Sequence, residues 1–129
     1  MIAVDTSALM AILLEEPQAN DCMAALERED EVIISAGTLT EALIVASKRG
    51  LDEAMAYLVG RFGFAVIDVT PAEARHAAAA HGIWGRGVHP AGLNFGDCFA
   101  YAVAKQHNCP LLFIGDDFAR TDIKSALES

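Results

Sequence analysis

Short runs of apolar residues alternate with longer helical stretches along this chain, and that alternation limits the fold more than any other feature of the sequence. Four runs rich in Ile, Val, Leu or Phe have the length of strands: residues 2–4, 31–36, 64–69 and 110–114. Six stretches have helical apolar spacing or helix-terminal residues: 7–14, 17–29, 38–50, 52–63, 70–82 and 94–108. This order predicts an α/β fold with a central, mostly parallel sheet flanked by helices on both faces.

Residues at the expected helix ends support these boundaries. Thr70 precedes Pro71, a pair typical of an N-cap followed by the first helical residue. Residues 38–41, Thr-Leu-Thr-Glu, fit the capping-box pattern S/T-x-x-E, so we expect a helix to begin there. Residues 94–97, Asn-Phe-Gly-Asp, are a looser version with an Asn cap. Residues 115–123 are expected to begin as a turn and to hold one more strand or helix.

The balance of charges restricts how this chain can bind a polyanion. Its 129 residues suit one domain, 1–129, and a hydrophobic fraction of 53% is ample for a core. Nine Lys and Arg against 18 Asp and Glu give a formal charge of −9. A protein that holds nucleic acid mainly by a basic surface has the opposite balance. A polyanionic substrate would therefore need bound cations, and the acidity equally suits a basic protein partner or solubility alone.

The three cysteines, Cys22, Cys98 and Cys109, argue against a disulfide framework and against a structural zinc site, because no C-x-x-C pair is present. Cys22 and Cys98 lie in apolar helical patterns and are predicted to be core residues. No apolar stretch reaches membrane-spanning length, and the first residues lack the basic flank of a signal peptide. We therefore expect a cytoplasmic location and no membrane partner.

Acidic residues follow the expected strands. Asp5 comes directly after the first strand, Glu41 is expected in the first turn of the helix after the second, and Asp116 and Asp117 follow the fourth. The carboxyl ends of parallel strands meet at one edge of the sheet, where α/β folds bind ligands. Asp97 is placed there less directly, because its helix follows a loop. Each residue alone is also explained as a helix cap or a first-turn acid.

The set of carboxylates is harder to explain by capping than its single members. Two unit charges ~4 Å apart repel by roughly 4 kcal/mol at an effective dielectric constant of ~20. Such a cluster needs either protonation or a hard cation, and carboxylate oxygens suit Mg²⁺ or Mn²⁺. Cations in such a site bind phosphate oxygens and activate water for phosphodiester cleavage. The hydroxyls of Thr6 and Ser7 are then expected to orient Asp5 or a metal-bound water.

Four stretches occur in the order and pattern of a known family: VDTSAL, ISAGTLTEA, GRGVHPAGLNFGDCFAYAVAK and LLFIGDDFARTDI. Nearly end to end, the chain resembles the PIN-domain ribonucleases of the VapC toxin type, from bacterial toxin–antitoxin pairs. The resemblance implies a PIN-like three-layer sandwich and Mg²⁺- or Mn²⁺-dependent cleavage of RNA. It also implies inhibition by a cognate VapB-type antitoxin and a homodimer.

The resemblance assigns the catalytic and metal-binding acids one by one. The family's positions fall on Asp5, Glu41 and Asp97. The family's fourth acid follows the last core strand, where the sequence GDDF offers two residues. Asp117 keeps the more regular position before Phe118 and is favoured, whereas Asp116 lies closer to the strand end and stays an alternative catalytic residue. Asp122 is a weaker candidate with an expected structural role.

Two residues in the Gly-rich segment 83–93 have both a functional and a structural interpretation. Arg86 can contact an RNA phosphate or simply be solvated. Trp84 can stack on a base or pack against the helix that precedes the segment, and packing is favoured.

Other classes of protein were weighed against the ribonuclease. A Mg²⁺-binding receiver domain also has Asp residues at strand ends, but it needs a Lys at the end of a late strand, where this chain has Ile-Gly-Asp-Asp. A phosphatase with an Asp nucleophile would have a second Asp two residues after Asp5, where this chain has Ser7. A catalytically inactive PIN-like interaction module is the remaining alternative, and failure to bind a divalent metal would favour it.

Overall fold

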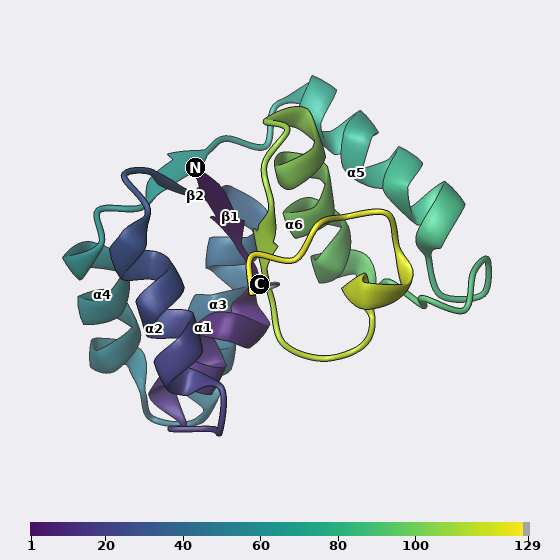
Figure 1. Cartoon of the computed structure of the whole chain (residues 1–129). Coiled ribbons are helices and arrows are strands. Elements are labelled where there is room, and N and C mark those ends of the chain that lie inside the picture. The colour runs from purple at the N-terminus through teal and green to yellow at the C-terminus, as the bar shows by residue number, and fades with distance from the viewer. Residues whose placement is uncertain (128–129) are drawn as a thin grey trace.

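The computed structural model describes residues 1–127, so residues 128–129 of the expected domain lie outside the described part. Its sheet has four parallel strands in the spatial order β3-β2-β1-β4, with bounds β1 Ile2–Val4, β2 Val32–Ser35, β3 Ala65–Ile67 and β4 Leu111–Leu112. All four strands lie within the predicted runs. The predicted parallel α/β architecture is therefore confirmed (Figure 1).

Helices fill the segments between the strands. The described residues contain α1 Thr6–Leu13, α2 Ala19–Arg28, α3 Ala36–Lys48, α4 Asp52–Arg61, α5 Pro71–Trp84, α6 Phe95–Gln106 and the 3₁₀ helix η1 Phe118–Arg120. The expected element in residues 115–123 is thus a short 3₁₀ helix. No helix in residues 1–127 is both long and apolar enough to span a membrane.

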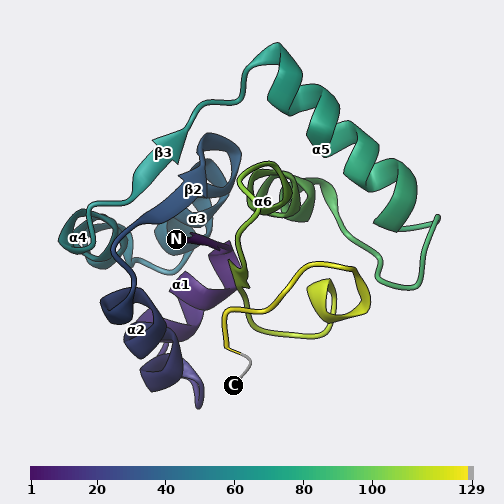
Figure 2. The ribbon, with the colours of Figure 1, turned by 45° about the horizontal axis from the view of Figure 1, so that its top comes forward.

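The side chains of the central strands alternate between two cores. Ile2 and Val4 pack on one face of the sheet with α1, α2, α3 and α4. Ala3 and Ile33 point to the other face, against α6 and the segment around Phe113. Figure 2 shows α6 between the sheet and α5, which lies outermost on that side. Helices, sheet and helices thus form three layers, as an α/β sandwich requires.

Two strands are no more than half as long as their apolar runs. β3 is an edge strand in which Ala65 and Val66 are exposed, and its pairing with β2 ends at Ile67. β4 pairs with β1 through Leu111 and Leu112 only. After it, Ile114 donates its backbone N–H to Ser7 Oγ at 3.0 Å instead of continuing the ladder. That bond directs the chain after β4 over the start of α1.

The predicted start of the third helix at Thr38 is wrong. α3 begins at Ala36, and Ser35 is its N-cap, because Ser35 Oγ accepts the backbone N–H of Gly37 at 3.1 Å. Ser35 is also the last residue of β2, so the chain passes from strand to helix without a loop. Thr38 is fully buried inside the helix. Glu41 therefore lies in the second turn of α3, and not in the first as expected.

Candidate active site

Asp5 lies at the carboxyl end of β1, in the N-cap position of α1. Its Oδ2 accepts the backbone N–H of Ser7 at 3.0 Å, so the capping interpretation is correct for one of its two oxygens. The side chain is 4% exposed, and Oδ1 is buried with no hydrogen-bond donor. Burial raises the pKa of Asp5 to about 6 against the hydrogen bonds from Ser7, and the charges of Asp97 and Glu41 raise it further. A buried acceptor without a donor is rare and needs a proton or a cation.

Glu41 reaches the same place from the second turn of α3. The hydroxyl of Thr6 donates to Glu41 Oε1 at 2.8 Å, across the gap between α1 and α3. The expectation that Thr6 orients Asp5 is therefore wrong, because its single proton goes to Glu41. Ser7 contacts Asp5 through its backbone N–H rather than through the hydroxyl that was expected to orient it, and that hydroxyl accepts the N–H of Ile114. The neighbouring residues Thr6 and Ser7 thus hold two carboxylates, that of Glu41 on α3 and that of Asp5 before α1.

Asp97 joins the other two acids from the N-terminus of α6. Asn94 Oδ1 accepts the N–H of Asp97 at 2.8 Å, and Asp97 Oδ2 accepts the N–H of Asn94 at 3.0 Å, which is the predicted capping box. Partial burial raises the pKa of Asp97 above its usual range, and the charges of Asp117 and Glu41 add to that rise. The backbone bond from Asn94 and the nearby Arg86 act in the opposite direction. Capping uses only Oδ2, so Asp97 can cap its helix and still offer an oxygen to the site.

The two aspartates after β4 differ in their relation to these acids. Both are exposed in the turn that leads into η1. The charge of Asp117, rather than that of Asp116, contributes to the raised pKa of Asp97. Asp122 is held elsewhere, since its carboxylate accepts from the hydroxyl of Tyr101 and from Lys105 Nζ, the latter at 3.1 Å. This favours Asp117 as the fourth acid and gives Asp122 the expected structural role.

The acids lie near one another but do not form a complete metal-binding site. Within residues 1–127, no three His, Cys, Asp or Glu side chains are grouped closely enough to hold one ion. Repulsion between like charges and the helix-cap bonds explain this arrangement, because each carboxylate rests on a backbone or hydroxyl donor. Asp5 Oδ1, which has no such donor, is the atom that most needs a cation.

Gly96 is a site residue that the sequence analysis missed. A Cβ atom added to it would lie 2.3 Å from Glu41 Oε2, so the Glu41 carboxylate rests on the first turn of α6 only because this residue has no side chain. The available signal was a glycine in the first turn of a helix, where alanine has the higher helix propensity. Such a cost indicates a close approach by another group.

We predict that Gly96→Ala lowers activity at least tenfold with little loss of stability. The added methyl group must displace the Glu41 carboxylate, which lies at the end of a flexible side chain, while alanine has a higher helix propensity than glycine. Cleavage rates and thermal unfolding check this. Gly60→Ala is the matched control, because a Cβ there meets no atom within 4 Å. Parental activity in Gly96→Ala would show that the position of Glu41 does not matter.

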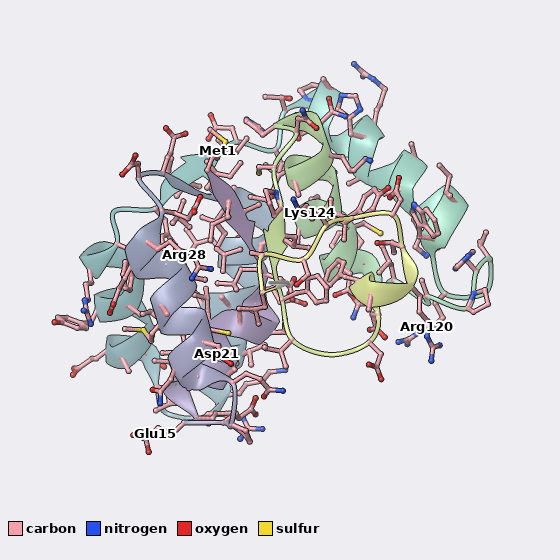
Figure 3. All side chains as sticks on the ribbon, in the orientation of Figure 1. Met1, Glu15, Asp21, Arg28, Arg120 and Lys124 are labelled. Carbon is pink, nitrogen blue, oxygen red and sulfur yellow. The ribbon has the colours of Figure 1, made fainter. Side chains whose placement is uncertain are left out.

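Two arginines and one tryptophan lie near the edge of the acidic site. Arg120 Nη1 donates to the Pro90 carbonyl at 3.2 Å, and Figure 3 shows its side chain on η1. Arg86 donates its backbone N–H to Leu93, beside the start of α6. Trp84 donates its indole N–H to the Tyr101 hydroxyl at 2.9 Å and is half-buried. Packing, rather than base stacking, therefore explains Trp84.

Comparison with known proteins agrees with this geometry. The PIN domain family model matches residues 2–124. Ribonuclease VapC28 of Mycobacterium tuberculosis is 43% identical over 133 residues, which cover 97% of each chain. Ribonuclease VapC42 of the same species is 42% identical, over 95% of this chain and 97% of its own.

Solved structures share the fold at lower identity. The sarcin-ricin-loop-cleaving toxin VapC20 of M. tuberculosis superposes with a TM-score of 0.76 at 18% identity, covering 95% of this chain and 96% of its own. A toxin–antitoxin complex from Klebsiella pneumoniae gives a TM-score of 0.73 at 20% identity, covering 95% and 93%. With a family model across the sheet and all six α-helices, and relatives above 40% identity along nearly the whole length, this chain belongs to the PIN domain family and, within it, to the VapC ribonucleases.

Proposed function

We propose that this chain is a Mg²⁺- or Mn²⁺-dependent ribonuclease, the toxin of a VapB–VapC pair, built as one PIN domain. The observation that carries the proposal is Asp5 Oδ1, a buried carboxylate oxygen with no donor, which has the charges of Glu41 and Asp97 beside it. A hard divalent cation satisfies that oxygen and offsets the repulsion, and oxygen ligands suit Mg²⁺ and Mn²⁺. When bound, the cation supplies activated water and stabilises charge on the phosphate.

The residues of the chain have separate tasks in this proposal. Asp5, Glu41, Asp97 and Asp117 would hold the cation, which requires their carboxylates to come closer together than they lie in residues 1–127. Thr6 keeps Glu41 in place through its 2.8 Å hydrogen bond, and Gly96 makes room for the same carboxylate. The cation reverses the local sign of charge, which lets a chain of net charge −9 accept RNA.

Arg86 and Arg120 are proposed to bind phosphates beside the cut. In the described residues neither guanidinium forms an ion pair with a carboxylate, unlike Arg61 and Lys105. Both lie on the side of the site formed by segment 85–93 and η1. A guanidinium there can pair with a phosphate of the RNA strand.

The proposed protein partners are a VapB-type antitoxin and a second copy of this chain, with the complex in the cytoplasm. Toxin–antitoxin complexes are among the solved structures with this fold. The acidic opening suits a basic antitoxin segment, and an Arg that enters it can replace the cation by pairing with carboxylates bidentately.

The two aspartates after β4 test the proposal with a built-in control. We predict that Asp117→Asn lowers RNA cleavage at least tenfold, because it removes a charge that acts on Asp97, and that Asp116→Asn stays near the parental rate. Initial rates in Mg²⁺ and in Mn²⁺ on single-stranded RNA check this. Equal rates for both variants and the parent would remove Asp117 from the site. A parent without activity in either metal would favour an inactive interaction module.

A further inference from the structure

The segment 85–93, which returns the chain from α5 to α6 beside η1, is closed by its own hydrogen bonds (Figure 2). At its base, Arg86 donates its N–H to the Leu93 carbonyl at 2.9 Å, and Leu93 donates to the Trp84 carbonyl at 3.0 Å. Leu93 is fully buried, so this base is anchored in the core. Arg86 lies close enough to Asp97 to counteract the rise of its pKa. The segment therefore has a defined shape next to the acids.

The side chain of His89 shapes the tip of this segment. Its Nδ1 accepts the backbone N–H of Ala91 at 3.0 Å, a bond from one residue to the second residue after it that resembles an Asx turn. Ala91 is only 2% exposed, so its N–H has little access to water, and leaving it without an acceptor would be unfavourable. A ring nitrogen that accepts a hydrogen bond carries no proton, which places the proton of the neutral ring on Nε2.

The ring of His89 is itself held in place. It contacts Trp84 edge to face, with ring centroids 4.7 Å apart and an interplanar angle of 73°. Trp84 is fixed in turn, because its indole N–H donates to the Tyr101 hydroxyl at 2.9 Å, and that hydroxyl donates to Asp122. These contacts tie the ring to α6 and to the segment after η1, so Nδ1 keeps its direction toward Ala91.

The turn made by His89 and Ala91 presents the carbonyl group of the residue between them, Pro90. Arg120 Nη1 donates to that carbonyl at 3.2 Å, although the two residues are 30 positions apart. A guanidinium has further N–H donors in the same plane, and these remain available. Asp117 is the N-cap of η1, and its carbonyl accepts the backbone N–H of Arg120 at 3.3 Å. The free donors of Arg120 therefore lie beside the acidic site.

The charge of Arg120 is not neutralised by a neighbouring acid. In residues 1–127 it forms no salt bridge, although Asp116, Asp117 and Asp122 are all within four positions of it. The side chain is exposed, and its acceptor, the Pro90 carbonyl, is neutral. A guanidinium held in this way keeps its full charge for an anion.

We propose that His89 is a positioning residue for the binding of RNA, because the turn that it makes orients the Arg120 guanidinium for a phosphate beside the cut. This inference rests on the proposed ribonuclease function. An exposed arginine loses side-chain freedom when it binds a phosphate, and the bond already made to Pro90 removes part of that loss in advance. His89 therefore acts on the affinity for RNA and not on the chemical step.

Three variants separate the ring of His89 from its acceptor, with KM and kcat measured on single-stranded RNA in Mg²⁺. His89→Phe keeps a ring against Trp84 but has no acceptor, so KM is expected to rise about 3- to 10-fold while kcat stays within about twofold. His89→Asn loses the ring but restores an acceptor for the same N–H, so KM is expected to stay within about 1.5-fold of the parent. His107→Ala is the matched control and should leave KM unchanged, because His107 Nδ1 also bonds to a backbone group, the Val103 carbonyl at 2.9 Å, but at the C-terminal end of α6.

A double-mutant cycle with Arg120 decides whether His89 acts through that guanidinium. Arg120→Ala is expected to raise KM at least as much as His89→Phe does, and adding His89→Phe to it should raise KM no further. An active parent whose KM is unchanged by His89→Phe would overturn the inference and leave the ribonuclease function intact. So would equal effects of His89→Phe with and without the Arg120 side chain, or a raised KM in His89→Asn. A parent that cuts no RNA overturns both proposals.

Discussion

Asp97→Asn is expected to abolish RNA cleavage while the protein stays folded. Asn keeps one acceptor oxygen for the N–H of Asn94, so the capping box survives. The loss of a charge that a cation needs should lower the cleavage rate by about 10³-fold or more, which corresponds to roughly 4 kcal/mol of transition-state stabilisation. If Asp97 were only a first-turn acid, the change would cost ~0.3–1 kcal/mol of helix-dipole energy and leave activity intact.

Thermal unfolding with and without Mg²⁺ separates these two roles. Without metal, Asp97→Asn should unfold at the parental temperature or above it, because repulsion with Asp5 and Glu41 falls. Added Mg²⁺ should stabilise the variant less than the parent, since the gain from a ligand follows its affinity for the native state. Asp21→Asn is the control, because Asp21 is a first-turn acid of α2 (Figure 3) whose charge is not among those that raise the pKa of Asp5 or Asp97. An Asp97→Asn protein with the parental rate and the parental gain from Mg²⁺ would show that the site is misplaced.

Asp5 should make the metal-free protein less stable as the pH rises from about 4 to 6. Its pKa is raised from 3.8 to about 6 in the folded protein, so the native state binds more protons than the unfolded chain in this window. The stability contributed by Asp5 is therefore greatest below pH 4, falls through the window and levels off above it. A shift of about two pKa units corresponds to a loss of roughly 3 kcal/mol at pH 7.

Denaturant unfolding in EDTA between pH 4 and 7 measures this contribution. Asp5→Asn cannot ionise, so its stability should fall less than that of the parent across the window. Saturating Mg²⁺ should reverse the order at pH 7, because only the parent gains a ligand for Oδ1. Parallel pH curves for the parent and Asp5→Asn would mean that the buried carboxyl group does not titrate there.

Local sequence was enough to predict the elements that depend on an apolar pattern or on hydrogen bonds between residues close together in the chain. Ile2, Val4 and Ile34 alternate with residues that face the other core, and a strand of that kind is visible in the apolar run itself. The capping box of Asn94 and Asp97 is equally local, because both hydrogen bonds join residues three positions apart. The meeting of acids at one edge followed from the parallel topology alone.

The details that sequence could not predict depend on contacts between distant segments. Thr38 fits a cap pattern, yet Ser35 caps α3. Ser35 is the last residue of β2, so the helix follows the strand directly and Thr38 lies buried within it. The Thr6 hydroxyl bonds to Glu41, 35 positions away, rather than to the adjacent Asp5. The role of Gly96 depends on the carboxylate of Glu41, which lies on another helix. No local pattern encodes such pairs.

The most direct test of the central claim is the cleavage of single-stranded RNA by antitoxin-free protein in Mg²⁺, in excess EDTA, and again after Mn²⁺ is added back. The carboxylate site predicts cleavage in Mg²⁺, none in EDTA and recovery with Mn²⁺, because the acids of a chain with charge −9 cannot approach a phosphate unaided. Asp97→Asn, run in parallel, should stay inactive in all three conditions and so exclude a contaminating nuclease. Undiminished cleavage in excess EDTA would contradict the account.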